Sequence, residues 1–133
     1  PGWRVIKDRG SLLIEPVQEA VKPLLEIKEH PYTPDFMIPR DKATACFDAD
    51  KLQHPLSLRL CRQGDSFVPF GMKGRKKVSD YLTDRKFSLL RKERQWVLCC
   101  GDDIIWLVGE RADNRFRIDE KTRKVLVVST IGQ

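Results

Sequence analysis

Hydrophobic and polar residues alternate along much of the chain, which is the pattern of half-buried β-strands. Residues 3–6 and 11–14 flank Asp8-Arg9-Gly10, a turn sequence in which glycine can adopt a positive φ, and this arrangement predicts a β-hairpin. Six further strands are expected at the remaining apolar runs, which are residues 24–27, 43–47, 56–60, 97–100, 104–108 and 124–128. The pattern therefore predicts a fold dominated by β-sheet.

The period of the pattern changes to that of a helix in the second part of the chain. Val78 and Leu82 lie four positions apart, which predicts a helix over residues 78–85 with both side chains buried. Apolar residues between 87 and 90 continue this surface and allow a second short helix. Three prolines between residues 31 and 39 indicate an extended connection. Together with the strands, these elements predict an α+β fold that is mostly β.

Length and composition are those of a water-soluble globular domain. The chain has 133 residues, of which 41% are hydrophobic and 33% are charged. We expect a hairpin and extended connection in residues 1–44, packed on a main domain formed by residues 45–133. No apolar run approaches the roughly 18 residues of a membrane span. Because the chain begins with Pro1 and enters a strand pattern almost at once, we expect it to be a fragment of a longer protein.

The cysteines and histidines do not form a recognisable metal site. The four cysteines are Cys46, Cys61, Cys99 and Cys100. None is in a C-x-x-C pair, and a disulfide between the adjacent Cys99 and Cys100 would be strained. Since these two fall in an apolar run, we expect reduced core cysteines in a cytoplasmic protein. His30 and His54 lie beside prolines, away from zinc-ligand spacing, and are expected at the surface.

Charge is distributed unevenly between the two parts of the chain. Residues 1–50 carry 7 basic and 9 acidic side chains, a net charge of −2, whereas residues 51–133 carry 18 and 10, a net charge of +8. An excess of positive charge in one region favours a polyanion as its partner.

The most informative segment is a glycine-punctuated loop at residues 63–74 with basic residues at its end, where the helix is expected to begin. The clustered cations are Lys73, Arg75, Lys76 and Lys77. A helix N-terminus presents free N–H groups and the positive end of the helix dipole, so cations placed there favour phosphate binding. A solvated basic turn would have the same sequence, and the residues alone leave both interpretations open.

Sequence patterns of common catalytic sites are missing from the chain. It contains neither a G-x-x-x-x-G-K-[ST] phosphate loop nor a G-x-S-x-G nucleophile elbow. Asp65 and Asp80 are candidate general bases, but capping of a loop and interaction with a helix dipole are the commoner roles for such residues. We therefore expect no catalytic residue, no metal site and no cofactor in this chain.

Residues 59–80 resemble the C-terminal domain of tRNA(Ile)-lysidine synthetase. The family pattern is G-D-x-F-x-P-x-G-M-x-G-x-K-K-x-S-D, and the matching residues are Gly64, Asp65, Phe67, Pro69, Gly71, Met72, Gly74, Lys76, Lys77, Ser79 and Asp80. The similarity extends over residues 45–129. This sequence differs from the family directly after Arg59. Many members have a basic and an aromatic residue at these two positions, whereas this chain has Leu60 and Cys61.

The resemblance implies a sandwich-like α+β fold, similar to a module of the phenylalanyl-tRNA synthetase β chain. It also implies a part in a larger ligase, which uses ATP and Mg²⁺ to attach lysine to the wobble cytidine of tRNA(Ile). The S-G-G-x-D-S motif of the family's N-terminal catalytic domain is missing here. The chain would then bind the tRNA acceptor stem and position the tRNA for that N-terminal domain, in the cytoplasm and away from membranes. Oligomerisation stays open.

Basic residues in and around the motif are the candidates for RNA contact: Arg59, Arg62, Lys73, Arg75, Lys76, Lys77, Arg91 and Arg94. The residues expected to shape the loop are Gly64, Asp65, Pro69, Gly71 and Gly74. Arg115 and Arg117 alternate as they would on a strand face, and either extend this track or form solvated surface. Since bases are hidden in the deep groove of an A-form stem, we expect contacts to phosphates and 2′-hydroxyls.

Two other classes of function compete with RNA binding. One is a structural module that supports another domain or a dimer without touching RNA, and the other is a stand-alone enzyme, which the missing catalytic patterns disfavour. Binding of RNA through phosphates would weaken strongly with salt, whereas a scaffold would not bind RNA.

Overall fold

The computed structural model describes residues 3–8, 11–16 and 21–131, with side chains described from residue 21 onward. Strands β1 (Trp3–Asp8) and β2 (Ser11–Pro16) pair antiparallel, with Val5 opposite Ile14. The alternating pattern therefore predicted this hairpin correctly. Gly10, in the expected turn, lies outside the described residues.

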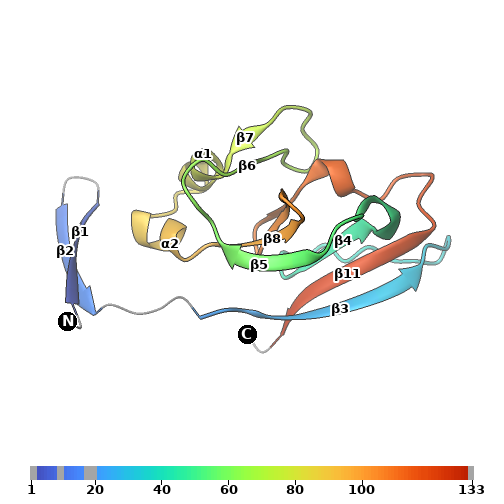
Figure 1. Ribbon diagram of the computed structural model, residues 1–133, viewed down its shortest axis with the longest axis horizontal. Coiled ribbons are helices and arrows are strands. Elements are labelled where there is room, and N and C mark those ends of the chain that lie inside the picture. The colour runs from blue at the N-terminus through green and yellow to red at the C-terminus, as the bar shows by residue number, and fades with distance from the viewer. Residues whose placement is uncertain (1–2, 9–10, 17–20, 132–133) are drawn as a thin grey trace.

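A four-stranded antiparallel sheet forms the centre of the domain (Figure 1). Its strands run in the order β10-β9-β8-β5, and their bounds are β5 (Leu56–Leu60), β8 (Trp96–Cys100), β9 (Asp103–Leu107) and β10 (Arg111–Ala112). Almost every residue of β8 and β9 is buried, because both faces of this sheet are covered. Cys99 and Cys100 lie in this buried part, as the apolar run predicted.

A three-stranded antiparallel sheet covers one face of the central sheet (Figure 1). Its order is β3-β11-β4, with β3 (Leu24–Pro31), β4 (Thr44–Asp48) and β11 (Lys124–Ile131). Phe47 and Val128 from this sheet share one hydrophobic cluster with Leu98 and Trp106 from the central sheet. Because β3 pairs with β11 along its whole length, residues before position 45 contribute a strand to the main domain.

A short hairpin and a helix cover the opposite face. Phe67, Val78 and Leu82 pack there against Val97 and Leu107 of the central sheet. The elements are β6 (Ser66–Phe67), β7 (Lys76–Lys77) and α1 (Val78–Asp84), followed by α2 (Leu89–Glu93), while the 3₁₀ turns are η1 (Ala49–Lys51) and η2 (Asn114–Phe116). Val78 and Leu82 are both buried, which confirms the helix phase expected from their spacing.

A β-bulge directs the side chains of β9 to these two cores. Leu98 is paired with Trp106 and Cys99 with Ile104, so Ile105 is an extra residue without a partner on β8. Its carbonyl oxygen instead accepts a hydrogen bond from the backbone N–H of Asp113 at 2.8 Å. The bulge thereby ties the centre of the sheet to the segment that follows β10.

The expected fold class is confirmed: the domain is α+β, mostly β, and built as packed antiparallel sheets with two short α-helices. In the described part of the chain, no helix has the length and apolar character needed to cross a membrane.

Candidate nucleic-acid interface

The loop of residues 68–75 connects β6 to β7 and is anchored at several points along its backbone. Ser66 is paired with Lys77 and Phe67 with Lys76, so a short ladder closes the base of the loop. The Phe70 N–H donates to the carbonyl of Ala112 at 2.9 Å, and the Asn114 N–H donates to the carbonyl of Val68 at 2.7 Å. The loop therefore has backbone support from a segment more than 40 residues away in the sequence.

Gly71 and Asn114 hold the tip of the same loop. The Gly71 N–H donates to Asn114 Oδ1 at 3.1 Å, and Gly71 has a φ of +87°, a conformation that glycine adopts without strain. Pro69, also expected to shape the loop, is buried and forms an isolated bridge with Asp113. Gly74 is exposed, and a Cβ added to it would meet no other atom within 4 Å.

Asp113 is a fully buried carboxylate that organises this anchoring segment. It accepts hydrogen bonds from the backbone N–H groups of Val68 at 2.9 Å and Arg115 at 2.7 Å. The guanidinium of Arg115 donates to both of its oxygens, with Nε and Nη2 each at 3.0 Å. These hydrogen bonds raise the pKa of Arg115 further above its ordinary value. A buried carboxylate therefore meets its hydrogen-bonding needs by fixing the start of the basic loop.

The interpretation of Arg115 and Arg117 as a strand face is wrong. Arg115 lies in η2 and is bound to Asp113, while Arg117 follows this turn and donates from Nη1 to the Asn114 carbonyl at 2.9 Å. The importance of Asp113 was also missed from the sequence. The available signal was an aspartate directly before a short turn, where it can cap the backbone N–H two residues later.

Asp65 organises the other end of the interface. It receives a two-point hydrogen bond from the Arg59 guanidinium, at 2.8 and 3.0 Å, and one from the Arg62 N–H at 2.7 Å. Although burial opposes the change, these partners hold the pKa of Asp65 below its ordinary value. Gly64 precedes it with a φ of +89°. The charge of Arg59 is thus matched inside the molecule, whereas Arg62 is exposed.

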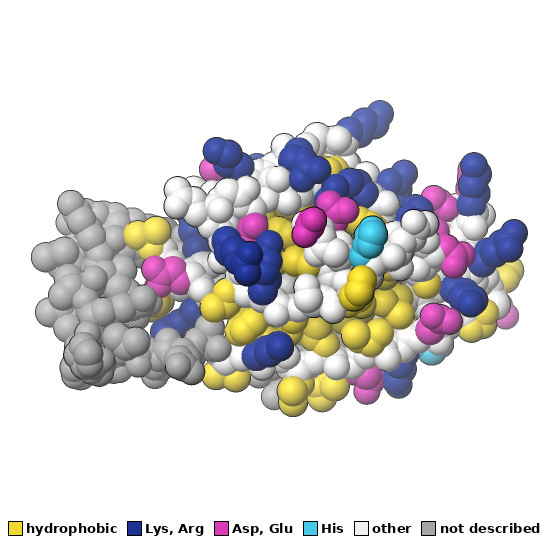
Figure 2. Space-filling view, in the orientation of Figure 1, with side chains coloured by type: hydrophobic (Ala, Val, Ile, Leu, Met, Phe, Trp, Pro, Cys, Tyr) yellow, Lys and Arg dark blue, Asp and Glu magenta, His cyan; other side chains and the backbone are white. Residues whose placement is uncertain are grey.

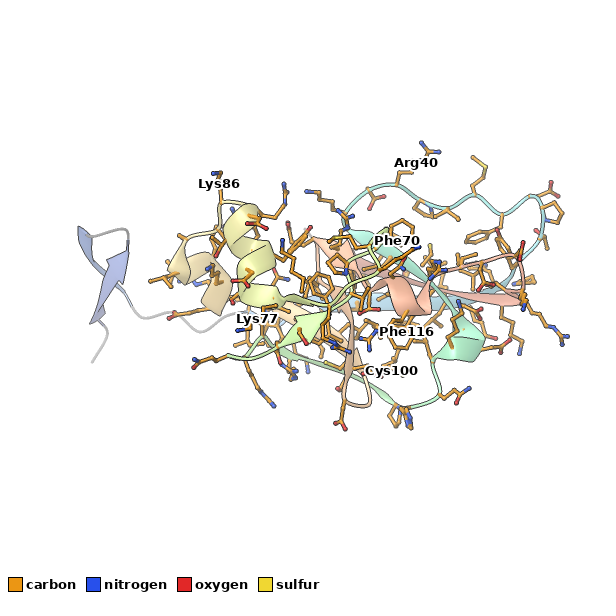
Figure 3. The ribbon with its side chains drawn as sticks, turned by 90° about the horizontal axis from the view of Figure 1, so that it is seen from above. Arg40, Phe70, Lys77, Lys86, Cys100 and Phe116 are labelled. Atoms are coloured by element: carbon orange, nitrogen blue, oxygen red, sulfur yellow. The ribbon has the colours of Figure 1, made fainter. Side chains whose placement is uncertain are left out.

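Strand geometry divides three of the four clustered cations, Arg75, Lys76 and Lys77. Side chains alternate across β7, so Lys76 lies on the side of α1 and forms an ion pair with Asp84. Lys77 and Arg75 project to the other side, where Arg75 Nη1 donates to Ser66 Oγ at 3.0 Å. Figure 3 shows Lys77 where β7 meets α1.

Exposed cations therefore remain in the loop, in β7 and in the turn before β6. We call this set the loop patch, and its members are Arg62, Lys73, Arg75 and Lys77. Lys73 and Lys77 form no ion pair with any residue that the structure describes. Figure 2 shows dark-blue side chains over the upper part of the molecule, where β6 and β7 lie in Figure 1. The loop patch therefore presents positive charge to solvent from a backbone that is held by hydrogen bonds.

The N-terminus of α1 offers less to a phosphate than the sequence led us to expect. Helix α1 has only seven residues, and its first residue, Val78, donates its N–H to the carbonyl of Asp65 at 2.9 Å. One of the N–H groups that this helix end could offer to a phosphate is therefore already used within the domain.

Arg91 and Arg94 lie around a different hollow, next to α2. The Arg91 guanidinium lies 3.8 Å from the centre of the Phe87 ring. Both arginines line the hollow together with Glu110, which is itself paired with Arg85 at 3.0 Å. No member of the loop patch lines this hollow.

The model for the TilS substrate C-terminal domain matches residues 56–129 of this sequence, more than half of the chain. The chain belongs to this family. The tRNA(Ile)-lysidine synthase of Bacteroides thetaiotaomicron is 60% identical over 133 residues, covering 97% of this chain and 31% of the relative. That of Parabacteroides distasonis is 49% identical over 144 residues, covering 97% and 33%. The chain spans about a third of the length of these relatives.

Two solved structures share the fold of this TilS domain. A crystal structure of a TilS C-terminal domain superposes with a TM-score of 0.65 at 19% identity, covering 82% of this chain and 85% of that one. An N-terminal fragment of the phenylalanyl-tRNA synthetase β-subunit from Pyrococcus horikoshii has a TM-score of 0.56 at 16% identity, covering 65% and 27%. The expected likeness to both folds is therefore confirmed.

The matched segment of the TilS domain includes the loop patch and both organising carboxylates, Asp65 and Asp113. Among the described residues, no three His, Cys, Asp or Glu side chains are grouped so that they could hold a metal ion. The four cysteines form no disulfide. His30 and His54 are exposed, as expected.

Proposed function

We propose that this domain binds the acceptor stem of tRNA(Ile) and positions the tRNA for a separate N-terminal domain of a longer protein. That domain would ligate lysine to the wobble cytidine, and the ATP and Mg²⁺ would be bound there, in the cytoplasm. The observation that carries the proposal is the loop patch, a set of exposed cations on an anchored loop in a domain of a tRNA-modifying family.

Anchoring suits the loop patch to binding a regular RNA stem. Hydrogen bonds to the carbonyl of Ala112 and the side chain of Asn114 already order the loop, so binding would not have to supply that order. Lys73, Arg75 and Lys77 are spread over five residues, and can contact successive phosphates. Such contacts recognise the shape and charge of a stem, which is how most A-form RNA is bound.

Salt dependence gives the most direct test. We would replace Lys73, Arg75 and Lys77 with alanine and measure binding of tRNA(Ile) and of its isolated acceptor-stem hairpin over a salt series. If each cation neutralises one phosphate, the log–log slope of affinity against salt falls by about 2–3 units. A matched control replaces Lys121, Arg123 and Lys124, which lie before or at the start of β11 and carry the same total charge.

The outcomes distinguish RNA binding from a scaffold. The proposal requires a weaker affinity and a smaller slope in the first variant, with both retained in the control. Equal affinities and slopes in wild type and the loop variant would show that RNA docks elsewhere. No measurable binding by the wild-type chain would favour a structural module. In a separate assay of lysine incorporation into tRNA, this chain by itself is expected to show no activity above a control without protein.

A further inference from the structure

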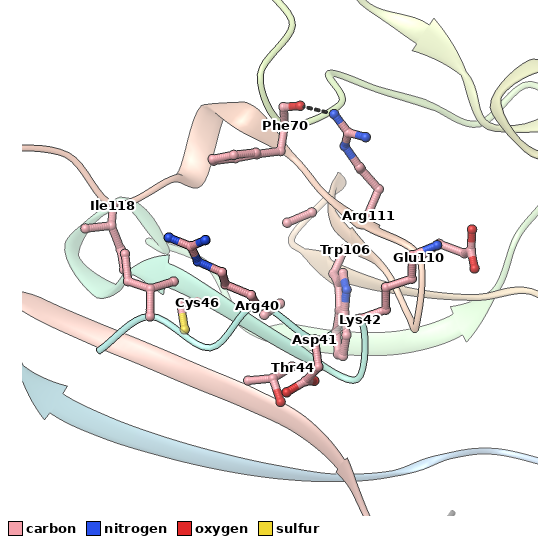
Figure 4. Close-up of a pocket in the computed structure, with 13 residues that line it drawn as sticks. Arg40, Asp41, Lys42, Thr44, Cys46, Phe70, Trp106, Glu110, Arg111 and Ile118 are labelled. Atoms are coloured by element: carbon pink, nitrogen blue, oxygen red, sulfur yellow. Dashed lines mark hydrogen bonds between the residues drawn. The ribbon is translucent and has the colours of Figure 1, made fainter. Parts of the chain in front are cut away.

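A pocket of about 260 Å³ opens between the basic loop and the segment that leads into β4 (Figure 4). Phe70 contributes from the loop, Arg40 and Cys46 from the segment before and within β4, and Trp106 and Arg111 from the edge of the central sheet. Arg111 donates a hydrogen bond to the carbonyl of Phe70, drawn as a dashed line in Figure 4, and so ties the basic loop to the central sheet. The pocket thus joins parts of the chain about 60 residues apart.

The walls of this pocket are largely apolar and include two aromatic rings. Trp106 is only 2% exposed, whereas Phe70 is 51% exposed. An aromatic residue half open to solvent on a hydrogen-bonded backbone is available for stacking without rearrangement of the loop. Burial, with a smaller contribution from Asp41, raises the pKa of Cys46 to about 11. The thiol is therefore neutral at pH 7 and adds to the apolar wall.

Charged side chains of both signs also line the pocket. Arg40, Lys42 and Arg111 supply cations, while Asp41 and Glu110 supply carboxylates. Glu110 is already paired with Arg85, so Asp41 is the carboxylate without an ion-pair partner among the described residues. The apolar wall and the Asp41 carboxylate suit a neutral flat ring with N–H donors. A phosphate attached to that ring would lie beside the cations Arg40, Lys42 and Arg111.

The pocket is also small. Its volume is below the roughly 300 Å³ at which pockets for drug-sized ligands begin, so it suits one ring system rather than a whole nucleotide cofactor. Phe70 is three residues from Lys73 in the loop patch, which places their backbones within about 11 Å of each other. A nucleic acid bound at Lys73 would therefore lie close to Phe70.

We propose that this pocket receives an unpaired nucleobase next to a bound RNA stem, stacked on Phe70, with its phosphate contacted by Arg40 or Arg111. This inference rests on the proposed binding of RNA and adds a second kind of contact to it. A stem supplies only phosphates and hydroxyls at the loop patch, whereas an unstacked base supplies an aromatic surface.

Two stem-loop RNAs that differ only in their bases test the pocket. Both carry the same stem and the same short 3′ single strand, but in one of them the single-stranded nucleotides are abasic, so the phosphate charge is equal. The wild-type chain should bind the RNA with bases roughly 5- to 160-fold more tightly, the range expected for one stacked base. Phe70→Ala should remove this preference and leave binding of the abasic RNA unchanged.

Matched variants keep the test specific. Met72→Ala changes another exposed side chain of the same loop, which does not line the pocket, and should retain the preference. Phe70→Trp keeps an aromatic face and should also retain it. Thermal unfolding of each variant checks that the loop change leaves the fold intact.

The possible failures differ from those of the proposed function. If the wild-type chain binds both RNAs equally well, the domain binds RNA but the pocket proposal is wrong. A preference that persists in Phe70→Ala also overturns it, because the unpaired base would then be bound outside this pocket. If neither RNA binds, both proposals are wrong.

Discussion

Two groups of basic side chains in this domain have the same chemistry but different surroundings. Arg59 and Arg115 donate two-point hydrogen bonds to Asp65 and Asp113. Lys73, Arg75 and Lys77 of the loop patch lie between these two ion pairs in the sequence, yet the two lysines face solvent without an acidic partner in the described structure. The first group holds the loop in place, and the second leaves its charge available to a ligand.

The difference shows that a basic residue's role depends on the nearest carboxylate. A guanidinium that satisfies a buried carboxylate contributes to stability, because removing either partner leaves an uncompensated charge. An exposed lysine contributes little to stability and can neutralise a phosphate. Substitutions in the first group should therefore change unfolding, and substitutions in the second group should change RNA affinity.

The largest effect is expected at Asp113. Asp113→Ala would remove the acceptor of two backbone N–H groups and leave the Arg115 guanidinium with its longer hydrogen bond to Asp103 at 3.4 Å, and should lower the free energy of unfolding by about 3–5 kcal/mol. Urea denaturation measures this change, with Asp102→Ala, an exposed acidic residue in the β8–β9 turn, as the control. A loss below about 1 kcal/mol would show that the loop does not depend on Asp113.

A core residue beside the interface should have a somewhat smaller effect. Leu82 is fully buried on α1 against the central sheet, so Leu82→Ala should cost about 2–4 kcal/mol. Leu89→Ala, at a position that is 46% exposed on α2, provides the comparison by the same denaturation measurement. Equal losses at the two positions would contradict the packing of α1.

Asp65 should link stability to pH. Asp65→Asn removes a charged acceptor of three hydrogen bonds and should cost about 1–3 kcal/mol at neutral pH. Since the pKa of Asp65 is lowered in the folded chain, the wild-type advantage is complete above the ordinary value of 3.8 and disappears as the pH falls toward the lowered value. Unfolding measured between about pH 7 and pH 2.5 tests this sign. A difference between the two proteins that grows on acidification would refute it.

The smallest expected effects separate two neighbouring lysines. Lys77→Ala should reduce the salt slope of RNA binding by up to about 1 unit, because Lys77 is exposed and unpaired among the described residues. Lys76→Ala should change that slope less, since Lys76 is paired with Asp84, and should cost under about 1 kcal/mol of stability. A larger slope change at Lys76 than at Lys77 would mean that RNA displaces Asp84.

Local patterns were sufficient for the longer strands and for α1, but not for the two-residue strands β6, β7 and β10. Alternation of apolar residues marked the strands, and the spacing of Val78 and Leu82 marked the buried face of α1. These signals are local because the side-chain period of a strand or helix is a property of neighbouring residues. The motif that resembled lysidine synthetase likewise lies within one short segment, and the family match confirms it.

Contacts between distant segments decided the rest. Nothing near Asp113 in the sequence shows that it holds Val68, which is 45 residues earlier, or that Ile105 is the extra residue of a bulge. The same applies to the pairing of β3 with β11 and to the pocket between Phe70 and Arg40. By itself, the sequence determined where the cations are and which segments form strands. Tertiary packing decided which cations have a carboxylate partner, because that depends on which residues fold to within hydrogen-bonding distance.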